Sequence, residues 1–292
     1  VMLQKLTSGA DRPLVIVARG DCTSRRALAL NPDLFDKSPA LRQSQKSTFA
    51  QLLDTLNGLS LTEEFLNSIS EVADMPRTLA SYYLGQANRD VLNCADADLL
   101  MLDSYADMNF SLWQNKAGGP RFWIHPKHLI DRAAFLEEHL ELGRASLDEA
   151  VRNATEFISR MRELAPGLPV LFLNQQVDYY PKLEDRQSEF YRFGALVAEQ
   201  APNTYFGGAI EKEQLALADV GSCGPGNTLH FQAETYRAMI ETAMAQGLGA
   251  AVAQRAVQKN ELQAQSASAQ HPSGSNAVAP APQSAQAGSE LR

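Results

Sequence analysis

The chain has 292 residues, of which 45% are hydrophobic, 21% charged and 8% aromatic. This is ordinary globular composition, and the length suits one large α/β domain or two smaller ones. Asp and Glu outnumber Lys and Arg by 34 to 26, so the formal net charge is −8. A surface that repels phosphate argues against non-specific nucleic-acid binding, unless its charge is strongly segregated.

The apolar runs and the cysteines restrict the class of protein further. No apolar run approaches the roughly 20 residues of a bilayer span, and no export signal opens the chain. The chain starts with Val1-Met2, so an upstream segment can be missing. Cys22, Cys94 and Cys223 cannot all pair, which excludes a disulfide scaffold at this size. We expect a soluble, cytoplasmic protein with reduced thiols.

Composition changes near residue 263. Residues 263–292 are mostly Ala, Gln, Ser, Pro and Gly, and their only large apolar residues are Val278 and Leu291. This segment cannot bury enough apolar surface to offset the entropy of ordering it, so we predict a disordered tail. Residues 1–262 are predicted to form one α/β domain with a helical insertion at about 43–93. The sequence does not reveal a partner for the tail.

Four short apolar runs are typical of strands in a parallel sheet that is buried on both faces. The runs at 14–18, 99–102 and 169–173 each stop at polar residues, and a weaker run at 204–206 stops at Gly207-Gly208. Ligands bind such sheets beyond the carboxyl ends of the strands, so the residues after each run are the candidates for a site.

Helices are predicted between these runs from apolar residues that repeat at helical spacing. Two of them follow capping boxes, Ser60-Leu61-Thr62-Glu63 and Ser146-Leu147-Asp148-Glu149, and the others cover 49–56, 190–197 and 233–246. Strands that alternate with helices predict an α/β three-layer sandwich, in which helices cover both faces of a mostly parallel sheet.

The segment Gly20-Asp21-Cys22-Thr23-Ser24 joins the first strand to a helix. Cys22 is therefore predicted near a helix amino terminus, where exposed N–H groups favour the reactive thiolate. Arg25 and Arg26 favour the thiolate as well, whereas Asp21 opposes it. The alternative is a buried cysteine packed under a helix, as free cysteines usually are.

A nucleophilic thiol needs a base, and His230 is the best placed of the five histidines. It follows a Gly/Pro-rich loop before the last predicted helix, and Asn227 stands three residues earlier, where it can orient the imidazole. A Cys22, His230 and Asn227 triad is workable, because the imidazole needs orientation more than a second charge. Alternatively, Asn227 only caps the last helix and His230 belongs to its first turn.

This order of parts resembles the SGNH (GDSL-like) hydrolase superfamily over residues 12 to 248. The family's Gly-Asp-Ser nucleophile turn corresponds to Gly20-Asp21-Cys22, and its Asp-x-x-His block to Asn227-x-x-His230. The Gly-x-Cys variant is similar to the GSCFA group and to acetyltransferase-like proteins of capsule-polysaccharide biosynthesis. The resemblance implies an SGNH/flavodoxin-like fold and acyl-ester hydrolysis or acyl transfer on a carbohydrate.

The sequence departs from the family pattern at several places. Cys22 replaces Ser and Asn227 replaces Asp, so ordinary esterase chemistry does not carry over directly, and Ser24 is a second candidate nucleophile. The family's Gly-x-Asn-Asp block has no clean match in 103–109. Asn109 is favoured there over Asp107, because an amide N–H stabilises a developing oxyanion and a carboxylate repels it. Asp107 can instead anchor a loop.

The predicted set of oxyanion and substrate-binding residues consists of Asn109 and Asp107 together with Asp21, Ser104, Arg25 and Asn174. Asn174-Gln175-Gln176 either contacts a polar ligand or satisfies loop backbone. No cofactor is expected to be required. Acyl-CoA is a suitable acyl donor, and Arg25 or Arg26 would bind its phosphate groups. The His125-Pro126-Lys127-His128 segment lacks an accompanying Cys or carboxylate motif, so we predict no metal site.

Trp113, Phe122 and Trp123 surround Gly118-Gly119-Pro120. If exposed, these rings would stack on a sugar or hold an acyl chain, and if packed inward they are core. The predicted function is an SGNH-like acyltransferase or ester hydrolase with a small-molecule or saccharide substrate. The alternative is an inactive SGNH-like binding or scaffold protein in polysaccharide biosynthesis, which the two replacements support. A nucleotide-binding fold is least favoured, since no Gly-x-Gly-x-x-Gly or P-loop is present.

Overall fold

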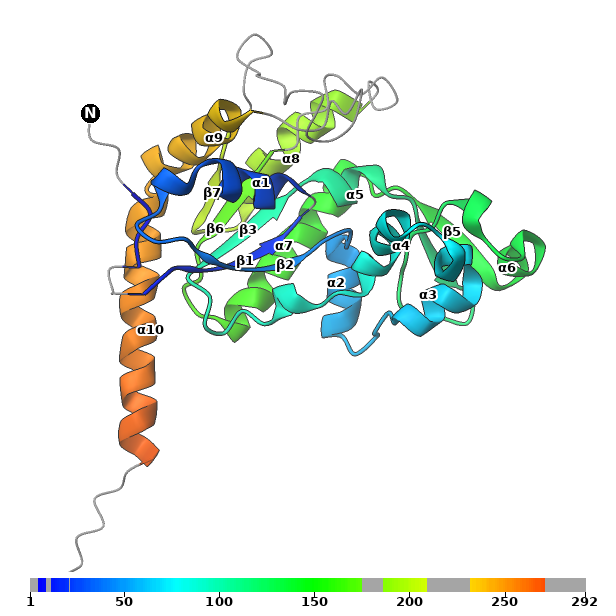
Figure 1. Ribbon diagram of the computed structural model, residues 1–292, viewed down its shortest axis with the longest axis horizontal. Coiled ribbons are helices and arrows are strands. Elements are labelled where there is room, and N and C mark those ends of the chain that lie inside the picture. The colour runs from blue at the N-terminus through cyan, green and yellow to red at the C-terminus, as the bar shows by residue number, and fades with distance from the viewer. Residues whose placement is uncertain (1–4, 9–11, 21, 175–185, 209–231, 271–292) are drawn as a thin grey trace, which may run out of the picture.

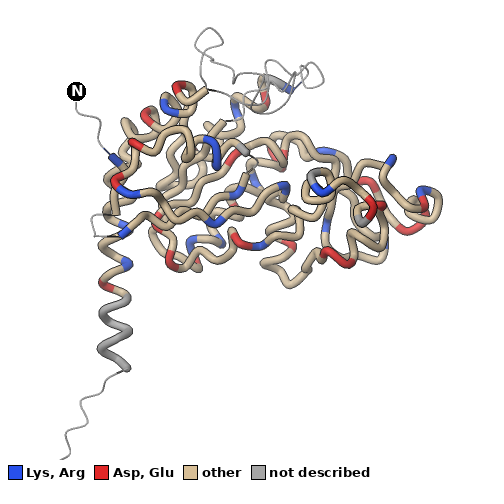
Figure 2. The backbone as a smooth tube through the Cα atoms, in the orientation of Figure 1, with Lys and Arg blue, Asp and Glu red and all other residues tan. Residues whose placement is uncertain are grey.

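The structure, a computed structural model, describes residues 5–8, 12–20, 22–174, 186–208 and 232–270 (Figure 1). Within this part of the chain, no helix is both long and apolar enough to cross a membrane. Lys and Arg are interspersed with Asp and Glu along the described backbone (Figure 2).

Five parallel strands form the central sheet, in the order β2-β1-β3-β6-β7. They are β1 (Val15–Arg19), β2 (Ala40–Ser44), β3 (Leu99–Asp103), β6 (Val170–Leu173) and β7 (Thr204–Phe206). The chain first adds β2 on one side of β1 and then returns to build β3 on the other side. This is the doubly wound arrangement, with its topological switch point between β1 and β3. The predicted α/β class with a mostly parallel sheet is confirmed.

Helices cover both faces of this sheet because its strands send alternate apolar side chains to the two sides. Val17 packs with α2 (Phe49–Leu56), α7 (Leu147–Leu164) and α8 (Gln187–Gln200). Ile16 and Ala18 pack on the opposite face with α1 (Cys22–Leu30), α9 (Ala233–Ala245) and α10 (Leu248–Gln270). Every residue of β3 is buried, as expected for a central parallel strand.

A helical lobe lies at one end of the molecule, and α10 extends at the other (Figure 1). The lobe has its own apolar cluster, which includes Trp113, Phe122 and Trp123. These three rings are at most 5% exposed, so they pack inward. The elements of this region are α3 (Glu63–Ile69), α4 (Arg77–Leu84), α5 (Tyr105–Asn109), α6 (Arg132–Glu138) and the antiparallel pair β4 (Leu112–Asn115) and β5 (His139–Gly143).

The two predicted capping boxes have different outcomes. Ser146 accepts a hydrogen bond from the Glu149 amide at 3.2 Å and begins α7, as predicted. For α3 the prediction of Ser60 as the cap is wrong, because Thr62 accepts the bond from the Phe65 amide at 3.2 Å. Leu61 is buried just before the helix, and α3 starts at Glu63, two residues later than predicted.

The last described helix runs past residue 262, where the composition predicted the tail to start, and continues to Gln270. Two basic side chains attach it to the loop before β3. Arg255 donates to the carbonyl oxygens of Ala95 and Ala97, at 3.0 and 3.2 Å. Lys259 Nζ lies 2.6 Å from Oδ1 of the fully buried Asp98. These contacts secure α10 at the amino-terminal edge of the sheet, opposite the edge where ligands are expected.

Candidate active site

The carboxyl ends of β1 and β3 meet at Gly20. A Cβ atom at Gly20 would overlap the Asp103 carboxylate and come within 3.1 Å of Ser24 Oγ. Only glycine lets the main chain approach Asp103 this closely. The contact brings the end of β3 against the first turn of α1, at the switch point of the sheet.

Two polar side chains at this edge are fully buried. Ser24 lies in the first turn of α1, and Asn174 directly follows β6, the strand next to β3. Among the described residues, none hydrogen-bonds to the Ser24 hydroxyl or to either polar atom of the Asn174 amide. Leaving such a group unpaired costs roughly 1–3 kcal/mol, so these groups call for a ligand, a water or a catalytic role.

The end of β3 supplies two more buried polar residues. Asp103 Oδ1 accepts a hydrogen bond from the Tyr105 amide at 3.1 Å and so supports the start of α5. Ser104 stands at the N-cap position of the same helix. Of the predicted residues, Ser24, Ser104 and Asn174 therefore come to the ends of neighbouring strands. Asp103 was not predicted as a site residue, although its place directly after an apolar run was the available signal.

A buried ion pair supports this edge of the sheet. Arg19, the last residue of β1, pairs with Asp107 and donates to the main-chain oxygen of Asp103 at 2.6 Å. Its guanidinium also lies 3.9 Å from the centre of the Phe49 ring. The other oxygen of Asp107 accepts from the Phe49 amide at 2.7 Å. Burial raises the pKa of Asp107 despite the opposing charge of Arg19. Because both its oxygens are engaged, Asp107 acts here as a positioning residue.

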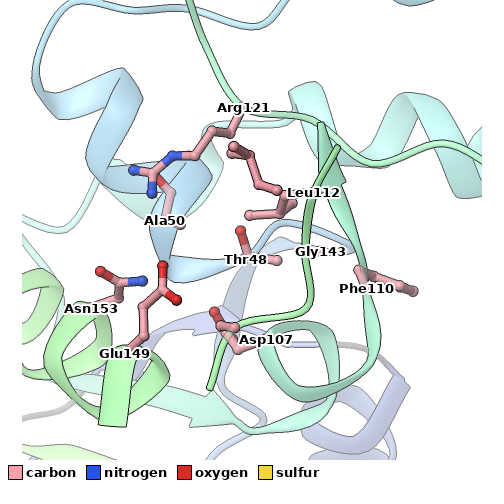
Figure 3. Close-up of a pocket in the computed structure, with 11 residues that line it drawn as sticks. Thr48, Ala50, Asp107, Phe110, Leu112, Arg121, Gly143, Glu149 and Asn153 are labelled. Carbon is pink, nitrogen blue, oxygen red and sulfur yellow. The ribbon is translucent and has the colours of Figure 1, made fainter. Parts of the chain in front are cut away.

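A small cavity lies beside this ion pair, lined by Thr48, Asp107, Arg121, Glu149 and Asn153 among others (Figure 3). Its volume of about 30 Å³ is enough for a buried water but too small for an ester substrate. It is therefore part of the support for α5 rather than a substrate site.

The predicted triad can be followed only in part. Cys22 is the first residue of α1, at the switch point, but its side chain lies outside the described part of the structure. Asp21, Asn227 and His230 also lie outside the described residues. The helix that follows the last two, α9, packs beside α1, and Asn31 Nδ2 donates to the Ala233 carbonyl at 3.2 Å.

Two predicted binding residues are not part of the buried polar group at this edge. Arg25 is exposed on α1. Asn109 ends α5 and lines a separate aromatic cavity of about 320 Å³. The described residues contain no group of three or more His, Cys, Asp or Glu side chains placed to hold a metal ion.

Comparison with solved structures finds distant likenesses in fold. No family model and no curated protein matches the sequence. The solved structures it is similar to include a carbohydrate esterase family 2 enzyme with a carbohydrate-binding domain from Corynascus thermopiles (Myceliophthora fergusii), with TM-score 0.42, 12% identity and coverage of 83% of this chain and 68% of that one. They also include an acetyl xylan esterase from Butyrivibrio proteoclasticus, with TM-score 0.35, 9% identity and coverage of 81% and 65%. The fold assignment depends on the strand order itself.

Proposed function

We propose that the chain is an SGNH-like enzyme that hydrolyses an acyl ester of a carbohydrate or transfers its acyl group, with Cys22 as the nucleophile. The observation that carries the proposal is the contact of Gly20 with Asp103 and Ser24, directly beside the residue that starts α1. This is the point of a doubly wound sheet where ligands bind. The motif resemblance at Gly20-Asp21-Cys22 supports the same assignment.

In the proposed first step, His230 takes the thiol proton of Cys22 and the sulfur attacks the acyl carbonyl carbon. The carbonyl π electrons move to oxygen, and N–H groups at the start of α1 stabilise that oxyanion. When the carbonyl re-forms, the bond to the sugar oxygen breaks. The sugar oxygen takes the proton from His230, and a thioester remains on Cys22.

In the second step, a hydroxyl compound attacks the thioester while His230 accepts its proton. The C–S bond then breaks, and the thiolate of Cys22 regains the proton. Water gives a carboxylic acid, and therefore hydrolysis, whereas a sugar hydroxyl gives a new ester, and therefore transfer. Acyl-CoA is a suitable donor for transfer, because Arg25 is exposed on α1 and can meet a phosphate group. Asn227 is assigned to orient the imidazole.

The side-chain donor for the oxyanion is assigned to Asn174 in preference to Asn109. Asn174 is fully buried at the end of β6, and its amide has no hydrogen-bond partner among the described residues. Asn109 stands at the far end of α5, five helical residues away from the sheet edge. An amide that is buried and unpaired before substrate binds is suited to stabilise a developing charge.

The test compares Cys22→Ala with Ser24→Ala on p-nitrophenyl acetate. Cys22→Ala is expected to lose at least about 100-fold in kcat/KM, and Ser24→Ala to lose far less. Mass spectrometry of the wild-type protein, quenched with acid during turnover of the ester, should find an acyl group on the Cys22 peptide, and the His230→Ala protein should carry less of it. Wild-type rates in Cys22→Ala would refute the mechanism, and loss in Ser24→Ala alone would assign the nucleophile to Ser24.

A further inference from the structure

The helical lobe holds an open cavity of about 320 Å³ near the end of α5. Its wall includes Tyr82 and Trp123, and its rim includes Asn109, Glu141 and Arg144. This volume falls in the range of small-molecule sites in proteins. The nucleophile mechanism uses none of these residues.

The aromatic wall of the cavity is held rigidly. The rings of Trp123 and Phe110 are stacked, with centroids 4.1 Å apart and planes 18° from parallel. Tyr82 meets Trp123 edge-on at 5.1 Å, and its ring is only partly buried. The indole N–H of Trp123 donates to the Lys46 carbonyl at 2.7 Å, which fixes the orientation of the ring. Trp123 is 5% exposed and the Lys46 ammonium lies 4.1 Å from the centre of the Tyr82 ring, so the partly exposed Tyr82 is the ring of this group that the cavity offers to a ligand.

The rim of the cavity is polar. Within the part of the chain that the structure describes, the side chains of Asn109, Ser111, Glu141 and Arg144 make no hydrogen bond or ion pair with the protein. Glu141 and Arg144 are exposed, and Asn109 and Ser111 are partly exposed. Together they offer amide, hydroxyl, carboxylate and guanidinium groups to a ligand. A pyranose ring matches such a site. Its C–H faces stack on aromatic rings, and the hydroxyl groups around its edge form hydrogen bonds with polar side chains.

The place of the cavity relative to the sheet edge suits an extended substrate. Ser104 marks one end of α5 at the candidate active site, and Asn109 marks the other end at the cavity. Five helical residues span about 7 Å. An oligosaccharide of two or more rings is therefore long enough to reach from the sheet edge to this cavity.

We propose that this cavity is a saccharide subsite, which stacks one pyranose ring on Tyr82 and hydrogen-bonds its hydroxyl groups through Asn109, Glu141 and Arg144. It deepens the proposed function and rests on it for the link between binding and catalysis. It names the substrate class as an oligosaccharide longer than the esterified residue.

Intrinsic fluorescence gives a direct readout, because the chain has two tryptophans and both Trp113 and Trp123 line this cavity. The probes are xylotetraose, cellotetraose, tetra-N-acetylchitotetraose and tetragalacturonate, titrated into wild type and into Cys22→Ala. At least one probe is expected to change the emission saturably in both proteins, with a Kd of about 1 mM or tighter. If none of the four does so, the proposal is overturned.

Variants then locate the binding. Tyr82→Ala and Arg144→Ala are each expected to weaken the binding of that probe about tenfold, a loss of ~1.4 kcal/mol. Arg144 is exposed, so its removal does not endanger folding, and Arg152→Ala on α7 is the matched exposed control. Unchanged binding in Arg144→Ala and Tyr82→Ala would place the sugar elsewhere and overturn the proposal.

Activity separates this proposal from the enzymatic one. Tyr82→Ala and Arg144→Ala should leave p-nitrophenyl acetate hydrolysis within about twofold of wild type, since that small ester does not reach the cavity. Saccharide binding that persists while Cys22→Ala keeps full esterase activity would refute the mechanism and keep the subsite. If Cys22→Ala loses esterase activity but no probe binds to either protein, the mechanism is supported and the subsite is refuted.

Discussion

Gly20 lies directly against the carboxylate of Asp103, and this contact joins the ends of the two strands that flank the switch point. The close approach depends on the absence of a side chain on Gly20. Since α1 begins two residues later with Cys22, the separation of β1 and β3 determines how the first turn of α1 faces the sheet edge. The candidate active site is therefore sensitive to a single methyl group.

Gly20→Ala is expected to destabilise the protein by roughly 1–3 kcal/mol and to reduce ester hydrolysis, because the new Cβ overlaps a buried carboxylate. Urea denaturation followed by circular dichroism measures the first effect. Gly85→Ala is the matched control, since its new Cβ would have only ordinary contacts of 3.5 Å or longer. Equal stability of the two variants would contradict the close approach at Gly20.

The Arg19–Asp107 pair makes the second prediction. Asp107→Ala should cost about 3–5 kcal/mol in unfolding free energy, because it leaves the fully buried Arg19 without its counter-charge. The double variant Arg19→Met, Asp107→Ala should be less unstable than the sum of the two single variants. Glu163→Ala, which breaks an exposed pair with Arg160, should cost about 1 kcal/mol or less. If the loss of unfolding free energy in the double variant equals the sum of the losses in the two single variants, Arg19 and Asp107 are not coupled.

The strands that the sequence predicted are those with strong apolar signals. β1, β3 and β6 are buried on both faces, so their continuous apolar runs stand out from their surroundings. The edge strand β2 was missed because it is mostly half-exposed and reads Ala-Leu-Arg-Gln-Ser, which has neither an apolar run nor clear alternation. Pairing with β1 makes it a strand, and a partner distant in sequence leaves no local pattern.

The candidate site was predictable only where it follows strand ends. Asn174 was predicted at this edge because polar residues after apolar runs share one edge of a parallel sheet. The partnership of Arg19 with Asp107 was missed, because 88 positions separate them and no spacing rule connects them. Trp123 left both a core and a ligand-binding interpretation open, since an aromatic ring suits either. Tertiary packing decides such cases: the ring is buried in the lobe and also forms part of a cavity wall.

Acid should weaken the attachment of α10 through Asp98. Burial alone would raise the pKa of Asp98, but hydrogen bonds from Arg12 and Lys259 outweigh it, so the pKa is lowered. A carboxyl group with a lowered pKa in the folded state contributes stability above its ordinary pKa of about 3.9, and this stability is lost as the pH falls through the folded value. The unfolding free energy of wild type should therefore fall as the pH drops below about 5.

The Asp98→Asn variant isolates this effect. Its unfolding free energy is expected to be lower than that of wild type at neutral pH and to change less between about pH 5 and pH 2. Asp36→Asn, at an exposed position, is the control and should retain the wild-type pH dependence. If the unfolding free energy of Asp98→Asn falls with acid as steeply as that of wild type, the attachment of α10 does not depend on this carboxylate.

The reactivity of the thiols distinguishes an enzyme from an inactive scaffold with the same fold. Burial raises the pKa of Cys94 to about 11, so this thiol is almost entirely protonated at neutral pH and serves as an internal reference. Cys22, at the start of α1, is expected to react with iodoacetamide faster than N-acetylcysteine does at pH 7, because the helix amino terminus stabilises its thiolate. Peptide mass spectrometry assigns each modified site, and Cys22→Ser should abolish the fast phase. A Cys22 that reacts no faster than N-acetylcysteine would favour the binding protein, because a nucleophile that is mostly protonated gives the proposed thioester chemistry no advantage over solution.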